Sequence, residues 1–187
     1  MRPALLPGTT IEMMFTPGAA DRQLTPMFSG GGLVLSQVCQ LSGLEGYIIQ
    51  NWIRRKYLPP PVGKKYTRRQ LCRVFNINLL KDTFTLEQTA ALLGYINGSL
   101  ADGSDNLIDD SRLYTYLVDC LVALGIPERL NLSRVAETVR AVTADFSAPR
   151  AGAEKRLWLV LEIMIAAYEA RRINHQALEL YSRLDYK

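Results

Sequence analysis

The sequence predicts a mostly α-helical protein in which a winged helix-turn-helix unit with a short wing precedes a C-terminal helical bundle. Beyond residue 33, apolar residues recur at helical spacing in almost every segment. Two capping boxes mark helix starts, and only residues 62–66 suggest a short strand hairpin. We divide the 187 residues into an extended N-terminal arm (1–32), a helix-turn-helix segment (33–98) and the bundle (99–187).

The N-terminal arm is rich in residues that interrupt helices. Prolines and glycines occur throughout it, and it ends in the run Gly30-Gly31-Gly32. It still carries apolar residues such as Ile11, Phe15 and Leu24, which a free tail rarely does. We expect the arm to lie extended on the domain or on a partner chain.

Two helices separated by a tight turn follow the arm. The first has Ser36 as its predicted N-cap and ends before the turn at Gly43. The second spans residues 45–56 and has one apolar stripe, from which we assign Trp52 to the core. The three prolines that begin at Pro59 end this helix.

The remaining helices are predicted from capping boxes and apolar stripes. Thr67 and Thr85, each followed three residues later by glutamine, open two of them. The stretch 157–168 is apolar nearly all round, which fits either a central core helix or half of a dimer interface. Heptads are not sustained, so no long dimerising coiled coil is expected. The last helices are expected over residues 111–124, 133–144 and 154–173, with a shorter one reaching residue 184.

Composition places the chain among ordinary globular proteins. Hydrophobic residues make up 48% and charged residues 21%, which argues against wholesale disorder. The three cysteines are far apart, a pattern typical of a reduced, cytoplasmic protein. The longest apolar stretch is shorter than the roughly 20 residues that a membrane span needs. We expect a cytoplasmic protein without a membrane partner.

Positive charge is concentrated in one segment. From Glu45 to Lys81 there are nine basic residues and one acid, a net charge of +8. Since the whole chain carries +4, the remainder carries 4 − 8 = −4. A basic segment on an otherwise acidic chain is the pattern expected of a polyanion-binding element. A solvated helix face is the commoner explanation of a charge run taken alone.

The helix-turn-helix and the basic loop after it carry the candidate site. The second helix presents amides and arginines, side chains that reach base edges and phosphates. A phosphate contact and a hinge that packs the wing are equally open roles for Tyr66. The candidate DNA-binding residues are Tyr47, Gln50, Asn51, Arg54, Arg55, Lys64, Lys65, Tyr66, Arg68 and Arg69.

The run from Tyr47 to Pro60, followed by a basic loop and Tyr66-Thr67, resembles the DNA-binding half of MerR-type regulators. This resemblance implies a winged helix-turn-helix that binds double-stranded DNA as a homodimer, with helix 45–56 reading bases and wing 59–66 holding phosphates. The chain departs from the family pattern at two positions. Gln50 stands where the family usually has arginine, and Lys56 stands where it usually has glycine, a residue suited to positive φ.

A second resemblance covers residues 33–117. The runs Tyr95-Ile96-Asn97-Gly98 and Asn106 to Tyr114 resemble an uncharacterised bacterial family, a domain of unknown function. That resemblance groups the sequence and implies no activity.

We expect a DNA-binding transcriptional regulator. The competing interpretation is a helical protein-interaction module that kept the helix-turn-helix scaffold without DNA binding. An enzyme is the weakest interpretation, because the chain has one histidine, no zinc-ligand spacing and no phosphate-binding loop. Asp102, Ser104 and Asn106 resemble the start of a calcium loop, but Leu107 and Leu113 stand where glycine and glutamate are required. No catalytic residue, metal or cofactor is expected.

A homodimer is expected because two half-sites give the specificity that one winged helix lacks. Two apolar surfaces are candidates for its interface, and an unidentified small-molecule or protein effector is a further possible partner. One surface is on the arm and the other is on the penultimate helix; they comprise Met13, Met14 and Phe15, and Trp158, Leu161, Ile165 and Tyr168.

Overall fold

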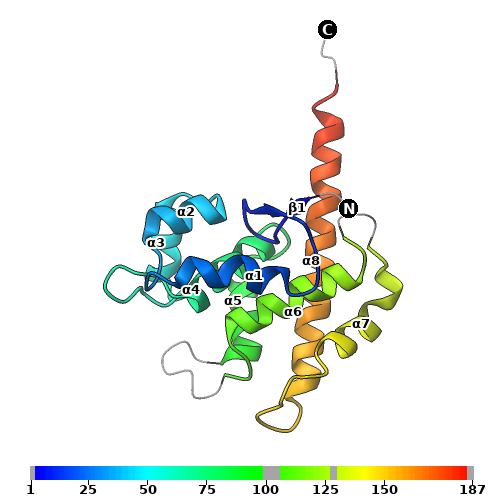
Figure 1. The fold of residues 1–187 in the computed structure, drawn as a ribbon. Coiled ribbons are helices and arrows are strands. Elements are labelled where there is room, and N and C mark those ends of the chain that lie inside the picture. The colour runs from blue at the N-terminus through cyan, green and yellow to red at the C-terminus, as the bar shows by residue number, and fades with distance from the viewer. Residues whose placement is uncertain (1–2, 99–105, 127–129, 185–187) are drawn as a thin grey trace.

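The protein is mostly helical, as the sequence predicts (Figure 1). The computed structural model describes residues 3–98, 106–126 and 130–184. The N-terminal elements are β1 (Ala4–Leu5), β2 (Glu12–Met13), α1 (Ala19–Leu24) and the 3₁₀ turn η1 (Thr25–Phe28). They are followed by α2 (Leu35–Ser42), α3 (Gly46–Arg54), α4 (Arg68–Leu80), α5 (Leu86–Asn97), α6 (Asp110–Ala123), η2 (Leu132–Arg134), α7 (Val135–Val142) and α8 (Ala153–Tyr181).

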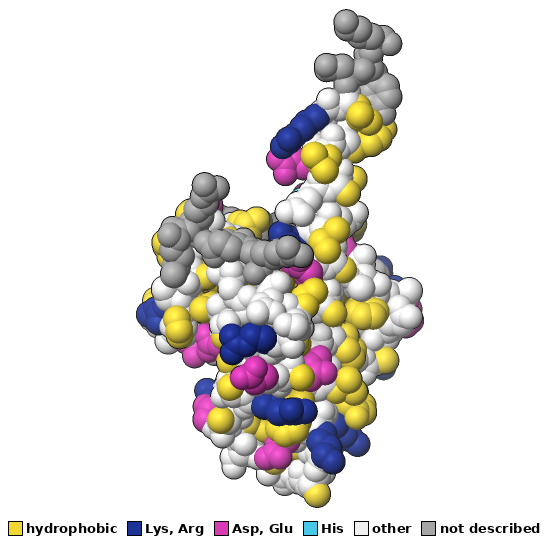
Figure 2. Space-filling view, turned by 90° about the vertical axis from the view of Figure 1, so that its right-hand side faces the viewer, with side chains coloured by type: hydrophobic (Ala, Val, Ile, Leu, Met, Phe, Trp, Pro, Cys, Tyr) yellow, Lys and Arg dark blue, Asp and Glu magenta, His cyan; other side chains and the backbone are white. Residues whose placement is uncertain are grey.

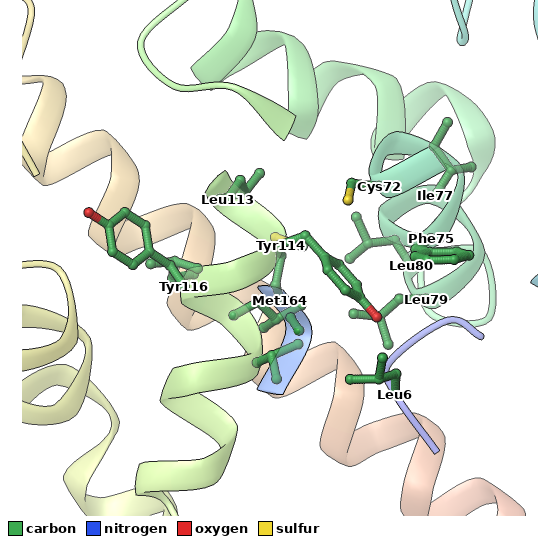
Figure 3. Close-up of a cluster of buried hydrophobic side chains, with 14 of the residues drawn as sticks. Leu6, Cys72, Phe75, Ile77, Leu79, Leu80, Leu113, Tyr114, Tyr116 and Met164 are labelled. Atoms are coloured by element: carbon green, nitrogen blue, oxygen red, sulfur yellow. The ribbon is translucent and has the colours of Figure 1, made fainter. Parts of the chain in front are cut away.

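Helices α4 and α6 form the centre of the core. Every residue of α4 from Gln70 to Leu80 is buried. Tyr114 of α6 reaches toward α4, where its ring centroid lies 5.5 Å from that of Phe75 (Figure 3). Its hydroxyl donates to the carbonyl of Pro7 at 2.8 Å. One hydrophobic cluster therefore contains residues from the N-terminal segment, the middle of the chain and the C-terminal helices.

The N-terminal segment lies on the domain as expected, but the prediction that it is extended was wrong. Strands β1 and β2 pair as an antiparallel hairpin, and α1 and η1 follow. Phe15 and Leu24 are buried in the core. The glycines and prolines stand at element boundaries: Gly18, with φ 72°, precedes α1, and Pro26 lies in the first turn of η1.

Both predicted capping boxes are confirmed. Thr67 and Gln70 exchange hydrogen bonds at the start of α4, and Thr85 and Gln88 do so at the start of α5. The N-cap predicted at Ser36 was wrong. The N-cap is Val34, two residues earlier, because the Gln37 side chain accepts the Val34 N–H at 3.0 Å and fixes the helix start there.

The predicted break near residue 173 was also wrong, since α8 is one helix of 29 residues. Its first half packs into the core, where Leu161 and Ile165 are fully buried. Phe15 is buried as well, so each of the two apolar surfaces expected to form a dimer interface contributes buried residues to the core, although Met14 is 45% exposed. The end of α8 projects from the body (Figure 1). No helix in the described ranges is long and apolar enough to cross a membrane.

Candidate nucleic-acid interface

A tight turn at Gly43 sets α2 against α3. Gly43 has φ 70°, and a Cβ added there would lie 2.9 Å from Cγ2 of Thr10, so the turn requires glycine. Ile49 and Trp52 fix α3 to the core, with Trp52 only 2% exposed. The assignment of Trp52 to the core is confirmed. Burial of this stripe leaves the opposite face of α3 open to solvent.

The open face of α3 is polar. Tyr47 is 71% exposed, and Gln50 and Arg54 are exposed on the same side of the helix, at intervals of three and four residues. Asn51 is half-buried, and its Oδ1 accepts a hydrogen bond from Nη2 of Arg54 at 2.7 Å. Four of the predicted residues therefore share one face and supply amide, guanidinium and phenol groups.

A short hairpin stands beside α3, as predicted for residues 62–66. Val62 and Lys65 form an antiparallel bridge, and Lys64 at the tip has φ 61°. Tyr66 exchanges two backbone hydrogen bonds with Leu33, at 2.7 and 3.0 Å, which anchors the hairpin to the segment before α2. Both lysines are exposed. The Tyr66 ring is 2% exposed, which supports a packing role for Tyr66.

A groove of about 510 Å³ separates α3 from the hairpin. Its polar groups are the hydroxyl of Ser36, the amide of Gln50 and the ammonium of Lys64. Ser36 was predicted only as a helix cap. Lys56, which is exposed and belongs to the basic run, was not among the predicted site residues. The groove is lined by Val34, Leu35, Ser36, Gln50, Ile53, Pro61, Lys64 and Tyr66.

Arg55 turns away from the groove toward α5. Its Nη2 lies 2.5 Å from Oε1 of Glu87, and its guanidinium lies 4.9 Å from the ring centroid of Tyr57. A backbone N–H, the Tyr57 hydroxyl and Arg55 together lower the pKa of Glu87, because all three stabilise its carboxylate. An intramolecular ion pair therefore occupies this predicted DNA contact.

Arg68 and Arg69 are also engaged inside the protein. Arg68 pairs with Asp21 of α1 and donates to the hydroxyl of Thr25 at 3.2 Å. Nε of Arg69 lies 3.5 Å from Asp109 and 3.6 Å from Asp110, at the start of α6. Both arginines were predicted as phosphate contacts. The structure places them at the junctions with the N-terminal segment and the bundle.

A buried ion pair continues this junction. Nη1 of Arg73 lies 3.2 Å from Oδ1 of Asp110, and the two side chains are 3% and 1% exposed. Nε of Arg73 donates to the carbonyl of Tyr57, and the Asn97 amide donates to Asp110. Burial raises the pKa of Asp110 and lowers that of Arg73, because both charges are removed from water. From the sequence, Arg73 stands out only as one of the nine basic residues between Glu45 and Lys81.

No chemical site was predicted at the cysteines, the histidine or the calcium-like loop. Within the described ranges, no group of three or more histidine, cysteine or acidic side chains could hold a metal ion. Burial raises the pKa of the Cys120 thiol to about 12. His175, on α8, is exposed. Asp102 and Ser104 of the calcium-loop comparison lie outside the described residues.

Comparison with known proteins identifies relatives of unknown function. Residues 32–117 match the family described as a domain of unknown function, DUF1836. The chain is also similar to the uncharacterized protein YkrK of Bacillus subtilis, with 29% identity over 112 residues. That match covers 55% of this chain and 48% of the relative, so it spans about half the relative's length. No solved structure matches. The family match includes α2, α3 and the hairpin, so the open face belongs to the shared region.

Proposed function

We propose that the protein is a cytoplasmic, DNA-binding transcriptional regulator that uses a MerR-like winged helix-turn-helix. The observation that carries the proposal is the groove between α3 and the hairpin, in which Gln50 of the polar face of α3 and Lys64 at the hairpin tip both take part. Lys65, exposed beside Lys64, adds a second positive charge to the hairpin. In this geometry α3 enters the major groove of duplex DNA and the hairpin lies along the phosphate backbone as a wing. Helices α4 and α6 form the rigid base that holds both.

The residues divide by the chemistry that they offer. The amides of Gln50 and Asn51 can each form two hydrogen bonds with adenine, which makes them the base readers. Arg54, Lys56, Lys64 and Lys65 are exposed cations that meet phosphates. Arg55, Arg68 and Arg69, with their ion pairs, hold the scaffold and make no primary contact with DNA. The proposed interface is thus smaller and more localised than the basic segment.

A regulator of this kind acts as a homodimer on a palindromic or pseudo-palindromic site. One α3 and one wing cover a short footprint, and two of them, about one helical turn apart on DNA, give the specificity that a genome demands. An effector acting through the C-terminal helices would alter the distance between the two α3 helices.

The experiment that tests this proposal is titration of the protein into labelled duplex DNA at several salt concentrations. The logarithm of the affinity should fall linearly with the logarithm of salt concentration, at a slope of about −0.9 per phosphate contact. Lys64→Ala with Lys65→Ala should reduce the magnitude of the slope by about 2 and weaken binding to all sequences alike.

A matched control replaces two exposed lysines outside the interface, Lys81→Ala with Lys155→Ala. This variant has the same net charge as the first, so any difference between the two depends on where the charges lie. Equal loss in both variants, or no binding to any genomic fragment at low salt, would contradict the proposed interface.

A protein-interaction module is the second candidate. Val34 is 42% exposed and lines the groove together with Leu35 and Ile53, so the same groove offers apolar surface to a peptide. Affinity for a protein partner that is insensitive to salt, together with no DNA binding, would support this alternative.

A further inference from the structure

A pocket of about 250 Å³ lies between the N-terminal hairpin of β1 and β2, the end of α4 and the middle of α8. None of its lining residues belongs to the proposed DNA interface. Strand β1 lies beside α8 (Figure 1), and the loop after β1 forms one wall of the pocket. An engineered cavity of about 150 Å³ holds benzene, so this pocket has room for a ring with a short substituent.

The wall formed by the hairpin and α4 is apolar. Leu6 and Leu79 are buried side chains that line the pocket, and Leu5, which is 54% exposed, extends the same wall toward solvent. Concave sites with a mostly apolar lining and a few convergent polar groups are typical of small-molecule binding. The apolar wall therefore suits the hydrocarbon part of a small ligand.

The opposite wall, on α8, carries the polar groups. Tyr168, Arg171, Arg172 and His175 line it at positions i, i+3, i+4 and i+7, which lie on one face of a helix. Figure 2 shows side chains of both charges close together where the projecting part of α8 leaves the body. The pocket thus places hydrogen-bond donors opposite an apolar wall.

Both arginines are held in place by acids and keep N–H groups for a ligand. Nε and Nη2 of Arg172 donate to the two carboxylate oxygens of Glu169 at 2.7 and 2.6 Å. Nη1 of Arg171 donates to the carbonyl of Asn78 at 2.8 Å, and its Nε lies 3.3 Å from Oδ2 of Asp82. Nη1 of Arg172 and Nη2 of Arg171 make no hydrogen bond to any residue in the described ranges.

The Tyr168 hydroxyl is a further donor without an internal partner. It makes no hydrogen bond within the part of the chain that the structure describes. Burial raises the pKa of Tyr168, and Glu169 adds to this effect, while Arg172 and Arg171 oppose it. Because burial is the largest of these effects, the phenol keeps its proton at neutral pH and can donate it to an anion.

We infer that this pocket binds a small aromatic monocarboxylate. The ring lies against the apolar wall, and the carboxylate accepts hydrogen bonds from the Tyr168 hydroxyl and the free N–H groups of Arg171 and Arg172. A single negative charge suits the site, because Glu169 and Asp82 already balance the two guanidinium groups. A phosphate ester would bring a second negative charge, which both acids repel.

The loop that forms the apolar wall is tied to the helix-turn-helix. The Asn78 amide donates to the carbonyls of Gly8 and Ser42, both at 2.9 Å, and so joins the pocket wall to the last residue of α2. Farther along the same loop, the N–H of Thr10 donates to the carbonyl of Leu41 at 2.9 Å. A ligand that fixes this loop therefore also fixes the turn that sets α2 against α3.

This coupling makes the carboxylate an effector, a role that rests on the proposed function. The ligand favours the state in which the loop, α2 and α3 are assembled, which is the state that presents α3 to DNA. Because coupling between two ligands is reciprocal, the carboxylate should raise the affinity for DNA, and DNA should raise the affinity for the carboxylate by the same factor. Binding of the carboxylate involves neither α3 nor the hairpin at residues 62–66, so it can be measured without DNA.

The first test is calorimetric titration of the full chain with cinnamate, cinnamamide and cinnamyl phosphate. The three probes share an apolar body and differ in the charge of the polar group. Cinnamate should bind with a dissociation constant below about 1 mM, and the neutral amide and the phosphate should each bind at least about tenfold more weakly. No binding of cinnamate, equal binding of all three probes, or tighter binding of the phosphate would overturn the inference.

The second test removes the tyrosine hydroxyl. Tyr168→Phe should weaken cinnamate binding about fivefold, because it deletes one hydrogen bond to the carboxylate. The fold should be unaffected, since this hydroxyl has no hydrogen-bond partner among the described residues. Tyr95→Phe, at a tyrosine of α5 that is 45% exposed and outside the pocket, should bind cinnamate as the parent protein does. Equal affinities of the two variants would contradict the inferred position of the carboxylate.

The third test compares Arg171→Gln with Arg156→Gln. Both arginines lie on α8, but Arg156 stacks over Tyr95 and does not line the pocket. Arg171→Gln should weaken cinnamate binding about tenfold or more, because it removes a charged donor, and Arg156→Gln should not. Circular dichroism checks that both variants keep the helical fold. An unchanged affinity in a folded Arg171→Gln variant would also contradict the inferred position of the carboxylate.

The final test measures the affinity for labelled duplex DNA with and without saturating cinnamate. We expect cinnamate to tighten DNA binding about fivefold or more. Cinnamate binding without any DNA binding would overturn the proposed function and leave the pocket supported. DNA binding that bound cinnamate does not change would overturn the effector role. DNA binding by a protein that does not bind cinnamate would overturn the inferred pocket and leave the proposed function supported.

Discussion

The basic segment divides into two halves with opposite surroundings. Between Arg54 and Lys65 its cations face solvent on α3 and the hairpin, apart from Arg55, which pairs with Glu87. Between Arg68 and Arg73 its cations point into the protein and pair with acids. The first half forms a surface suited to a polyanion, and the second half joins three parts of the chain.

The difference shows that a charge run in a sequence does not define one surface. All three arginines of α4 find their acidic partners far away along the chain, on α1 and at the start of α6. Only the fold brings these residues together. The predictions below test this division, first in the buried half and then in the exposed half.

The largest effect is expected at the buried pair. Asp110→Asn preserves the shape of the side chain but removes the charge opposite Arg73. We expect the free energy of unfolding to fall by about 3 kcal/mol, because a buried guanidinium is left without its counter-charge. Urea-induced unfolding followed by circular dichroism would measure the change.

Two further variants make this comparison specific. Asp145→Asn removes the partner of Arg112 in an ion pair whose side chains are 46% and 61% exposed, and it should have a small effect. Arg73→Met added to Asp110→Asn should recover part of the loss by removing the unpaired charge. The division is contradicted if the Asp110 and Asp145 variants lose equal stability.

A smaller effect is expected from the base-reading face. Asn51→Ala should relax preference at one base pair of the selected site by about 1–3 kcal/mol, with little change in salt dependence. Asn174→Ala, at an exposed asparagine on α8, serves as the control. Selection of binding sites from a random duplex library measures both. Identical preferred sites for the wild type and Asn51→Ala would remove Asn51 from the readers.

Local sequence signals predicted much of the fold and less of the site. Capping boxes at Thr67 and Thr85 and the glycine turn at Gly43 depend on residues a few positions apart, so they could be read directly. The hairpin and helix at the N-terminus were missed, because Gly18 and Pro26 fit the ends of elements as well as they fit an irregular chain. Whether an arginine such as Arg55 or Arg68 faces solvent or pairs inside the protein depends on an acid at least 32 residues away in the sequence. Arg55 pairs with Glu87 and Arg68 with Asp21, and no local pattern reveals such contacts.

The smallest effect is expected at Lys56, in the exposed half. Lys56 follows Arg55, the C-cap of α3, and has φ 60°, a backbone conformation that strains a residue with a Cβ. MerR-type regulators usually have glycine at this position. Lys56→Gly should relieve a strain of about 1 kcal/mol, while the greater entropy of glycine in the unfolded chain offsets part of the gain. We expect the free energy of unfolding to rise by about 0.5 kcal/mol at most. Lys56→Ala removes the same charge but keeps the strain, so it should show no gain in the free energy of unfolding.

If Lys56 meets a phosphate, both variants should weaken DNA binding equally. A Lys56→Gly variant that is more stable but binds DNA more weakly would show that the exposed half of the basic segment contributes to binding and not to stability. A less stable Lys56→Gly variant would instead place Lys56 with the buried half, whose cations stabilise the fold.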